Sequence, residues 1–170
     1  MAELLTYATI ADMVRRFDEQ ELIELTDTTN IPPSEINEAK VQAAIDDAVA
    51  TVDGFIGVVY RLPLQGCAKP VTTPGGAIEY AAPPKLTRWV CDIARYNLYD
   101  DLAPENEVYR RYKATLAELR SFADHGELLA CPWGGSPGDL IGTDPLNPGG
   151  KTLFCASPRR ITDATVKDYK

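Results

Sequence analysis

At 170 residues the chain has the size of one domain, and folding of such a chain buries roughly 70% of the surface that is exposed when it is unfolded. Its composition, 45% hydrophobic and 25% charged, is ordinary for a globular protein and excludes a wholly disordered, collagen-like or coiled-coil chain. The net charge of −8 is opposite in sign to that of proteins that grip DNA phosphates, so tight nucleic-acid binding is not expected.

The first seven residues lack the basic start and apolar stretch of a signal peptide, and no run of about 18 apolar residues predicts a membrane span. We therefore expect a protein that is made in the cytosol and has no membrane partner. Successive cysteines are 24, 40 and 24 positions apart and there is one histidine, which is too dispersed for a zinc site. In a cytosolic chain they are predicted to be four independent thiols, at Cys67, Cys91, Cys131 and Cys155.

Three helices are predicted in the first 60 residues. Thr9 and Asp12 form a capping box before apolar residues at helical spacing over 10–17. Asp18 can cap a second, short helix, and a loop rich in Thr, Asp, Asn and Pro follows it. Ser34 is expected to open a long, alanine-rich helix over 35–59. Its predicted apolar face consists of Ile36, Ala39, Ala43, Ala44, Ala48, Val52, Phe55, Ile56 and Val59.

Proline and glycine then interrupt the helical pattern. Within the stretch 66–82, two short apolar runs, 71–73 and 77–80, flank a Pro-Gly-Gly turn and predict a small β-hairpin. Pro84 is suited to the first turn of a fourth helix, which Asp100 and Asp101 are expected to end. Pro104 is expected to begin a fifth, which stops at His125 and Gly126. The predicted fold class is all-α: a bundle of four to five helices over 1–126.

The last 44 residues, 127–170, differ in composition from this bundle. They hold six Gly and five Pro, where no helix should persist, but apolar residues are spread along them. We interpret 127–170 as an extended arm with anchors at intervals. Such an arm can wrap its own domain or reach into a neighbouring protein.

Residues that could carry chemistry also have structural interpretations. His125 lies at a predicted helix end, where its charge favours the helix dipole, and Cys91 is expected to be a small core residue. The glycines at 134, 135 and 138 lack the Lys-Ser or Lys-Thr pair of a phosphate-binding loop. No cofactor, metal or catalytic residue is therefore expected. The alternative is a metal-dependent hydrolase, which would use Asp46, Asp47, Asp92 or Asp100.

A polar and aromatic network is predicted on the fourth helix. Asp92 and Arg95 are three residues apart beside apolar neighbours, which favours a partly buried ion pair within the bundle. Tyr96 and Tyr99 belong to a group of aromatic residues that could stack on single-stranded nucleic acid. The acidic balance of the chain favours core packing and subunit contacts instead.

Several short blocks resemble a Mu-like phage neck family, the head-to-tail adaptor (head completion, connector) proteins. The blocks are YAT at 7–9, DMVRRF at 12–17, ELIELTD at 21–27, DGFI at 53–56, YRLPL at 60–64, CDIARYNLY at 91–99, RRY at 110–112 and LFCASPRRIT at 153–162. The chain departs from the family pattern at the longer insertion 66–82, and at Ile161, where the pattern has an aromatic residue.

The resemblance implies a non-enzymatic virion protein, assembled in the host cytoplasm. It would form an all-helical ring of twelve copies beneath the portal protein and join the DNA-filled head to the tail. Its implied partners are the portal, neighbouring copies, a tail-side neck or tail-completion protein, and genomic DNA that passes through the lumen without tight binding. The chain could instead be such a tail-completion protein. The expected docking residues are Trp133, Phe154, Pro158, Arg159, Arg160 and Ile161.

Overall fold

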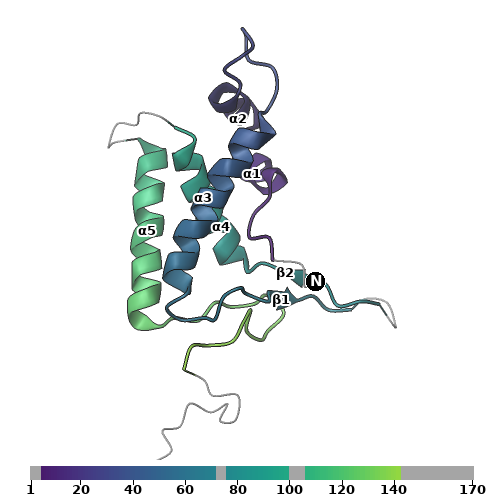
Figure 1. Ribbon diagram of the computed structural model, residues 1–170, viewed down its shortest axis with the longest axis vertical. Coiled ribbons are helices and arrows are strands. Elements are labelled where there is room, and N and C mark those ends of the chain that lie inside the picture. Colours follow the sequence, from purple (N-terminus) through teal and green to yellow (C-terminus); the bar gives the residue numbers. More distant parts are fainter. Residues whose placement is uncertain (1–4, 72–75, 100–105, 143–170) are drawn as a thin grey trace, which may run out of the picture.

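The computed structural model describes residues 5–71, 76–99 and 106–142, which form five helices and one two-stranded antiparallel sheet. Helices α3, α4 and α5 pack against one another as the body of the molecule, and α1 packs against α3 and α4 (Figure 1). The mostly helical fold class is confirmed for these residues. The elements are α1 (Ile10–Arg16), α2 (Glu19–Thr26), α3 (Glu38–Ile56), β1 (Cys67–Ala68), β2 (Tyr80–Ala81), α4 (Pro84–Asn97) and α5 (Glu107–His125).

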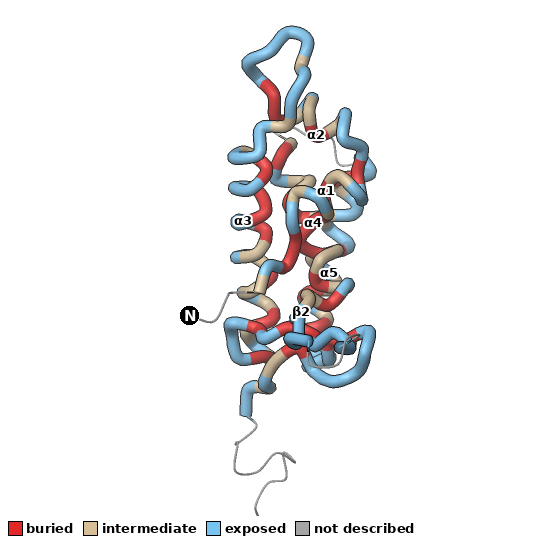
Figure 2. Tube along the Cα trace, turned by 90° about the vertical axis from the view of Figure 1, so that its right-hand side faces the viewer, coloured by how far each residue is buried: buried red, intermediate tan, exposed pale blue. Residues whose placement is uncertain are grey.

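The core lies between the inner faces of α3, α4 and α5, where buried residues follow one side of each helix (Figure 2). At one end of it three aromatic rings meet. The ring of Phe122 contacts Trp89 edge-on at 5.7 Å between centroids and stacks against Tyr60 at 6.4 Å. All three side chains are almost fully buried. This aromatic cluster joins α5 to α4 and to the segment that follows α3.

The two N-terminal helices begin where the sequence predicts. The Oγ1 of Thr9 accepts a hydrogen bond from the backbone N–H of Asp12, and the carboxylate of Asp12 accepts one from the N–H of Thr9. Asp18 likewise caps α2 by accepting from the N–H of Gln20. Each cap satisfies donors that the first turn of a helix leaves unpaired.

Helix α3 begins at Glu38, with Asn37 as its cap, so the predicted start at Ser34 is wrong. The reason lies in the preceding loop, where the carboxylate of Asp27 accepts hydrogen bonds from six donors over residues 29–35, the N–H of Ser34 among them at 2.9 Å. Ser34 therefore closes a loop and does not start a helix. This loop projects beyond the helical body (Figure 1), and Ile31 in it is 99% exposed.

The predicted apolar face of α3 is correct in part. Ala44, Ala48, Val52 and Ile56 are buried, but Ala39 and Ala43 are exposed, and the buried Val41 and Ile45 take their place. Alanine is found both in solvent and in the core, so the sequence of an alanine-rich helix specifies only weakly which of its faces is buried. Here the two large β-branched residues, Val41 and Ile45, determine the buried face.

Helix α4 has Pro84 at its first position, as predicted, and ends at Asn97, while Asp100 and Asp101 lie outside the described residues. Helix α5 begins at Glu107 behind a cap by Asn106, later than the predicted start at Pro104. Its end is as predicted, because Gly126 adopts the left-handed conformation (φ 61°) that closes helices.

A hairpin is present in the 66–82 insertion, but its strands pair nearer the base than predicted. Cys67 pairs with Ala81 and Ala68 with Tyr80, while 71 and 77–79 are not in strands and 72–75 lie outside the described residues.

Residues 127–142, the described part of the predicted arm, lie against their own chain. The N–H of Arg61 donates to the carbonyl of Asp139, the N–H of Gln65 to that of Pro137, and Tyr60 forms a single antiparallel bridge with Leu140. A disulfide joins Cys67 to Cys131, so the prediction of four independent thiols is wrong. The hairpin base and residues 127–142 pack at the same end of the bundle, which brings two cysteines 64 positions apart to a Cα separation of 5.5 Å.

Candidate functional site

The polar network of α4 is built around Arg95, but its partner is not the predicted one. The guanidinium of Arg95 contacts both carboxylate oxygens of Glu21 on α2 at 2.8 Å, and the hydroxyl of Tyr99 donates to the same carboxylate at 2.6 Å. The guanidinium also lies 4.5 Å from the ring centre of Phe17. The predicted Asp92–Arg95 pair is wrong: a planar guanidinium favours a carboxylate that offers both oxygens, and Glu21 does so from across the bundle.

Asp92 points into a small surface pocket of about 260 Å³ between α1, α4 and α5. Its carboxylate lies 3.4 Å from the hydroxyl of Thr115, and Arg16, Arg88 and Arg111 line the pocket with it. Burial raises the pKa of Asp92, against the opposing effect of the three arginines and the Thr115 hydroxyl. The carboxylate thus lies among cationic groups from three helices, which suits a structural role.

The tyrosines of α4 and α5 form a second contact between these helices. The rings of Tyr96 and Tyr112 are stacked at 3.9 Å between centroids, and Tyr109 lies tilted against Tyr96 at 6.1 Å. Because their faces cover one another, these rings do not form an open platform for nucleic-acid bases. Packing between helices is the use that the structure supports for them.

The acidic residues of the hydrolase alternative do not converge within the described residues. Asp46 and Asp47 are exposed on α3, Asp92 lies in the arginine-lined pocket, and Asp100 is outside those residues. No group of three potential metal ligands occurs in the part of the chain that the structure describes. Cys91 is buried, which raises the pKa of its thiol to about 12, too high for a nucleophile at neutral pH.

His125 is placed as predicted, in the last turn of α5, where its Nδ1 lies 2.8 Å from the carbonyl oxygen of Ser121. No helix within 5–71, 76–99 and 106–142 has the length and apolar content to cross a membrane.

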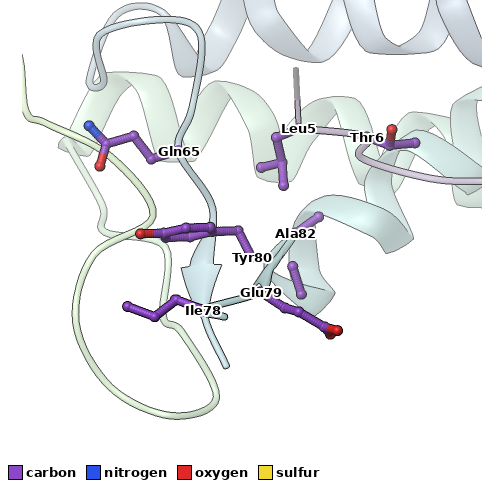
Figure 3. A pocket seen from close by; sticks show the side chains of 8 residues that line it. Leu5, Thr6, Gln65, Ile78, Glu79, Tyr80 and Ala82 are labelled. Carbon is purple, nitrogen blue, oxygen red and sulfur yellow. The ribbon is translucent and has the colours of Figure 1, made fainter. Parts of the chain in front are cut away.

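A groove of about 500 Å³ opens beside the hairpin (Figure 3). Leu5 and Thr6 form one wall, and the strand around Tyr80 forms the other, with Gln65 at one end. The side chains of Ile78 and Tyr80 are more than half exposed. Exposed large apolar residues beside a hollow are typical of surfaces that bind other proteins.

Of the six predicted docking residues, the structure describes only Trp133. It follows the disulfide-linked Cys131 in a turn closed by the hydrogen bond from the N–H of Gly134 to the carbonyl of Cys131, and its ring is about half exposed. Phe154, Pro158, Arg159, Arg160 and Ile161 lie outside the described residues.

Two structurally important residues were missed by sequence reasoning. Glu21 is 74 positions from Arg95, and no local pattern links them. Tyr60 directly follows the predicted helix over 35–59 and no structural role is predicted for it, but its buried hydroxyl accepts a hydrogen bond from the N–H of Leu129 at 3.0 Å and so anchors residues 127–142.

The described residues thus define a small α-helical protein whose polar and aromatic clusters hold helices together and whose surface carries a groove beside the hairpin. The chain belongs to the Bacteriophage Mu, Gp36 family, whose model matches residues 7–130. It is also similar to the Mu-like prophage FluMu protein gp36 of Haemophilus influenzae, with 28% identity over 121 residues that cover 71% of this chain and 72% of the relative. The protein is therefore a Mu-like phage protein.

Proposed function

We propose that this protein is a non-enzymatic structural component of the phage neck, a head-to-tail adaptor that forms a ring under the portal and joins the DNA-filled head to the tail. Membership of a phage Mu family supports a role in the phage particle. The observation that carries the proposal is the way in which residues 127–142 are fixed to the helical body by backbone hydrogen bonds and a disulfide. A firmly attached base suits an arm, 143–170, that must transmit a docking contact to its own subunit.

The charges of the chain support the same role. Residues 143–170 hold five Lys and Arg against three Asp, so they carry +2, and with −8 for the whole chain residues 1–142 carry −10. In the proposed assembly, Arg159 and Arg160 make bidentate contacts to carboxylates of the portal or of the next subunit. The apolar part of this contact is made by Phe154, Pro158, Ile161 and Trp133.

The acidic body also suits a conduit for DNA. A ring of copies that each carry −10 on residues 1–142 repels a passing duplex and does not hold it. Twelve copies, as the family resemblance implies, would form such a ring in the neck of the virion, assembled in the host cytoplasm.

Native mass spectrometry of the full chain, alone and mixed with the portal ring encoded by the same genome, tests the proposal. We expect a fixed, symmetric number of copies to bind the portal, and a chain that ends at Gly142 to lose this binding while keeping its fold. The cut is placed at Gly142 because a cut at Gly126 would also remove the buried Leu129 and the disulfide-linked Cys131.

Other outcomes of this experiment would redirect the proposal. Binding to a tail-side ring but not to the portal would make the protein a tail-completion component. Binding to neither, together with a melting temperature that rises with a divalent metal ion, would favour the hydrolase alternative.

A further inference from the structure

One end of the helical body carries a hollow lined by apolar residues and by their backbone. Val58 and Val59 follow α3, Ala123 and Gly126 end α5, and Leu128, Leu140 and Ile141 come from residues 127–142; together they line an open hollow of about 290 Å³. We name this hollow the end pocket. Val58, Leu128 and Ile141 are 60%, 63% and 51% exposed, which is unusual for three large apolar side chains in one place and is typical of a binding site.

The walls of the end pocket are fixed by the backbone. The N–H of Ile141 donates to the carbonyl of Val59 at 2.8 Å, and the buried Leu129 is held through its N–H by the hydroxyl of Tyr60. On the α5 side, the N–H of Gly126 closes the helix on the carbonyl of Phe122. The end pocket is therefore formed before any ligand binds, so binding needs no reorganisation of its walls.

We propose that the end pocket binds Leu153 and Phe154 of the chain's own C-terminal arm. The described structure stops at Gly142, next to Ile141 in the pocket wall, and 28 residues follow. Leu153 and Phe154 are adjacent large apolar residues in this stretch. The sequence Pro148-Gly149-Gly150 lies between them and the pocket and is suited to a turn that reverses the chain.

The end pocket could bind Leu153 and Phe154 of its own chain or of a second copy, and the short connection between the pocket and Leu153 favours its own chain. Only residues 143–152 separate Gly142 from Leu153. A connection of this length gives an effective concentration on the order of millimolar, far above that of a second copy in dilute solution. The arm of the same chain therefore occupies the pocket in the free subunit.

This contact bears on assembly in a way that rests on the proposed function. Phe154 is one of the expected docking residues, so the end pocket covers it in the free subunit, and the portal or a neighbouring copy must displace it. Phe154 is then released from the end pocket only when a partner protein competes with the pocket for it.

The test uses Cys155, which follows Phe154. In the full chain carrying Ala123→Cys, mild oxidation should link the new thiol in the pocket wall to Cys155 within one chain, detected by peptide mass spectrometry. The matched control is Ala43→Cys, on the exposed face of α3. The end-pocket thiol should react at least about tenfold faster than the control, because docking raises its local concentration of Cys155. The remaining thiol, Cys91, is buried.

Two further variants keep the test decisive. Leu128→Cys, at an exposed wall position, replaces Ala123→Cys if that variant does not fold, and Phe154→Ser should remove the rate difference. Equal rates for the pocket and control thiols, or links only between two chains, would overturn the assignment. Portal binding is measured separately: its absence with the intrachain link intact would contradict the adaptor role and leave the contact standing.

Discussion

One buried hydroxyl group, that of Tyr60, adds to the backbone hydrogen bonds and the disulfide that attach residues 127–142 to the helical body. Tyr60→Phe keeps the ring and its stacking on Phe122 but leaves the N–H of Leu129 without its acceptor. Tyr60 is 1% exposed and Leu129 2%, so water cannot replace the hydroxyl without opening the structure. An unsatisfied buried donor costs about 1–3 kcal/mol, and we expect the free energy of unfolding to fall by that amount.

Urea unfolding followed by circular dichroism, with the disulfide intact, measures this change. The midpoint should fall with an unchanged slope, and the melting temperature should drop by about 2–4 °C per kcal/mol for a chain of this size. The matched control is Tyr80→Phe, since Tyr80 is 54% exposed and removal of an exposed hydroxyl changes stability by less than about 0.5 kcal/mol. A Tyr60→Phe variant as stable as this control would refute the role of the hydroxyl as an anchor.

Three further outcomes are expected. Glu21→Gln should lower the free energy of unfolding by about 1–3 kcal/mol, since it leaves the half-buried Arg95 without its carboxylate. Burial opposes ionisation of Glu21, but hydrogen bonds from Arg95 and Tyr99 outweigh it and hold its pKa below the ordinary 4.5. The Glu21–Arg95 pair of the wild type therefore stabilises the folded state fully above pH 4.5, and this stabilisation is lost as the pH falls through the lower pKa that Glu21 has in the folded protein. Urea midpoints that depend equally on pH in the wild type and in Glu21→Gln would contradict this role of the pair. Non-reducing peptide mapping should find Cys67 linked to Cys131, and replacing both by Ser should lower stability by about 2–4 kcal/mol; free thiols at both positions in the native protein would contradict the link. Asp27→Asn should speed cleavage of the loop after Glu35 by a glutamate-specific protease, because an amide cannot accept all the hydrogen bonds that the Asp27 carboxylate accepts. The control is Asp124→Asn, at an exposed position of α5. Equal cleavage rates in the two variants would argue against the role of Asp27.

The sequence predicts helix ends correctly where the interaction that ends the helix involves residues close together in the chain. The capping box of Thr9 and Asp12, the cap by Asp18, and the stop at Gly126 each depend on residues within four positions, and the structure confirms all three. Such signals also indicate four to five helices, of which the described residues form five, and a hairpin within 66–82, but not which residues pair in its strands.

Predictions failed where a distant residue decided the outcome. Ser34 has the character of a helix cap, but Asp27 binds its N–H. Arg95 has an acid three positions away, but Glu21 is better placed to receive both of its N–H groups. The pairing of Cys67 with Cys131 depends on two segments meeting at one end of the bundle. None of these partners can be inferred from spacing, because each is created by the packing of helices and loops.

The disulfide has a mechanical consequence for a protein whose arm is pulled. Tension applied to the arm travels back along the chain to Cys131 and then crosses directly to Cys67, 64 positions earlier. The residues between them, which include all of α4 and α5, lie off this covalent path and are not stretched. A load that pulls the ends of the chain apart can extend only the residues outside the covalent loop, so α4 and α5, which supply Trp89 and Phe122 to the aromatic cluster, are not pulled straight unless the bond itself is reduced.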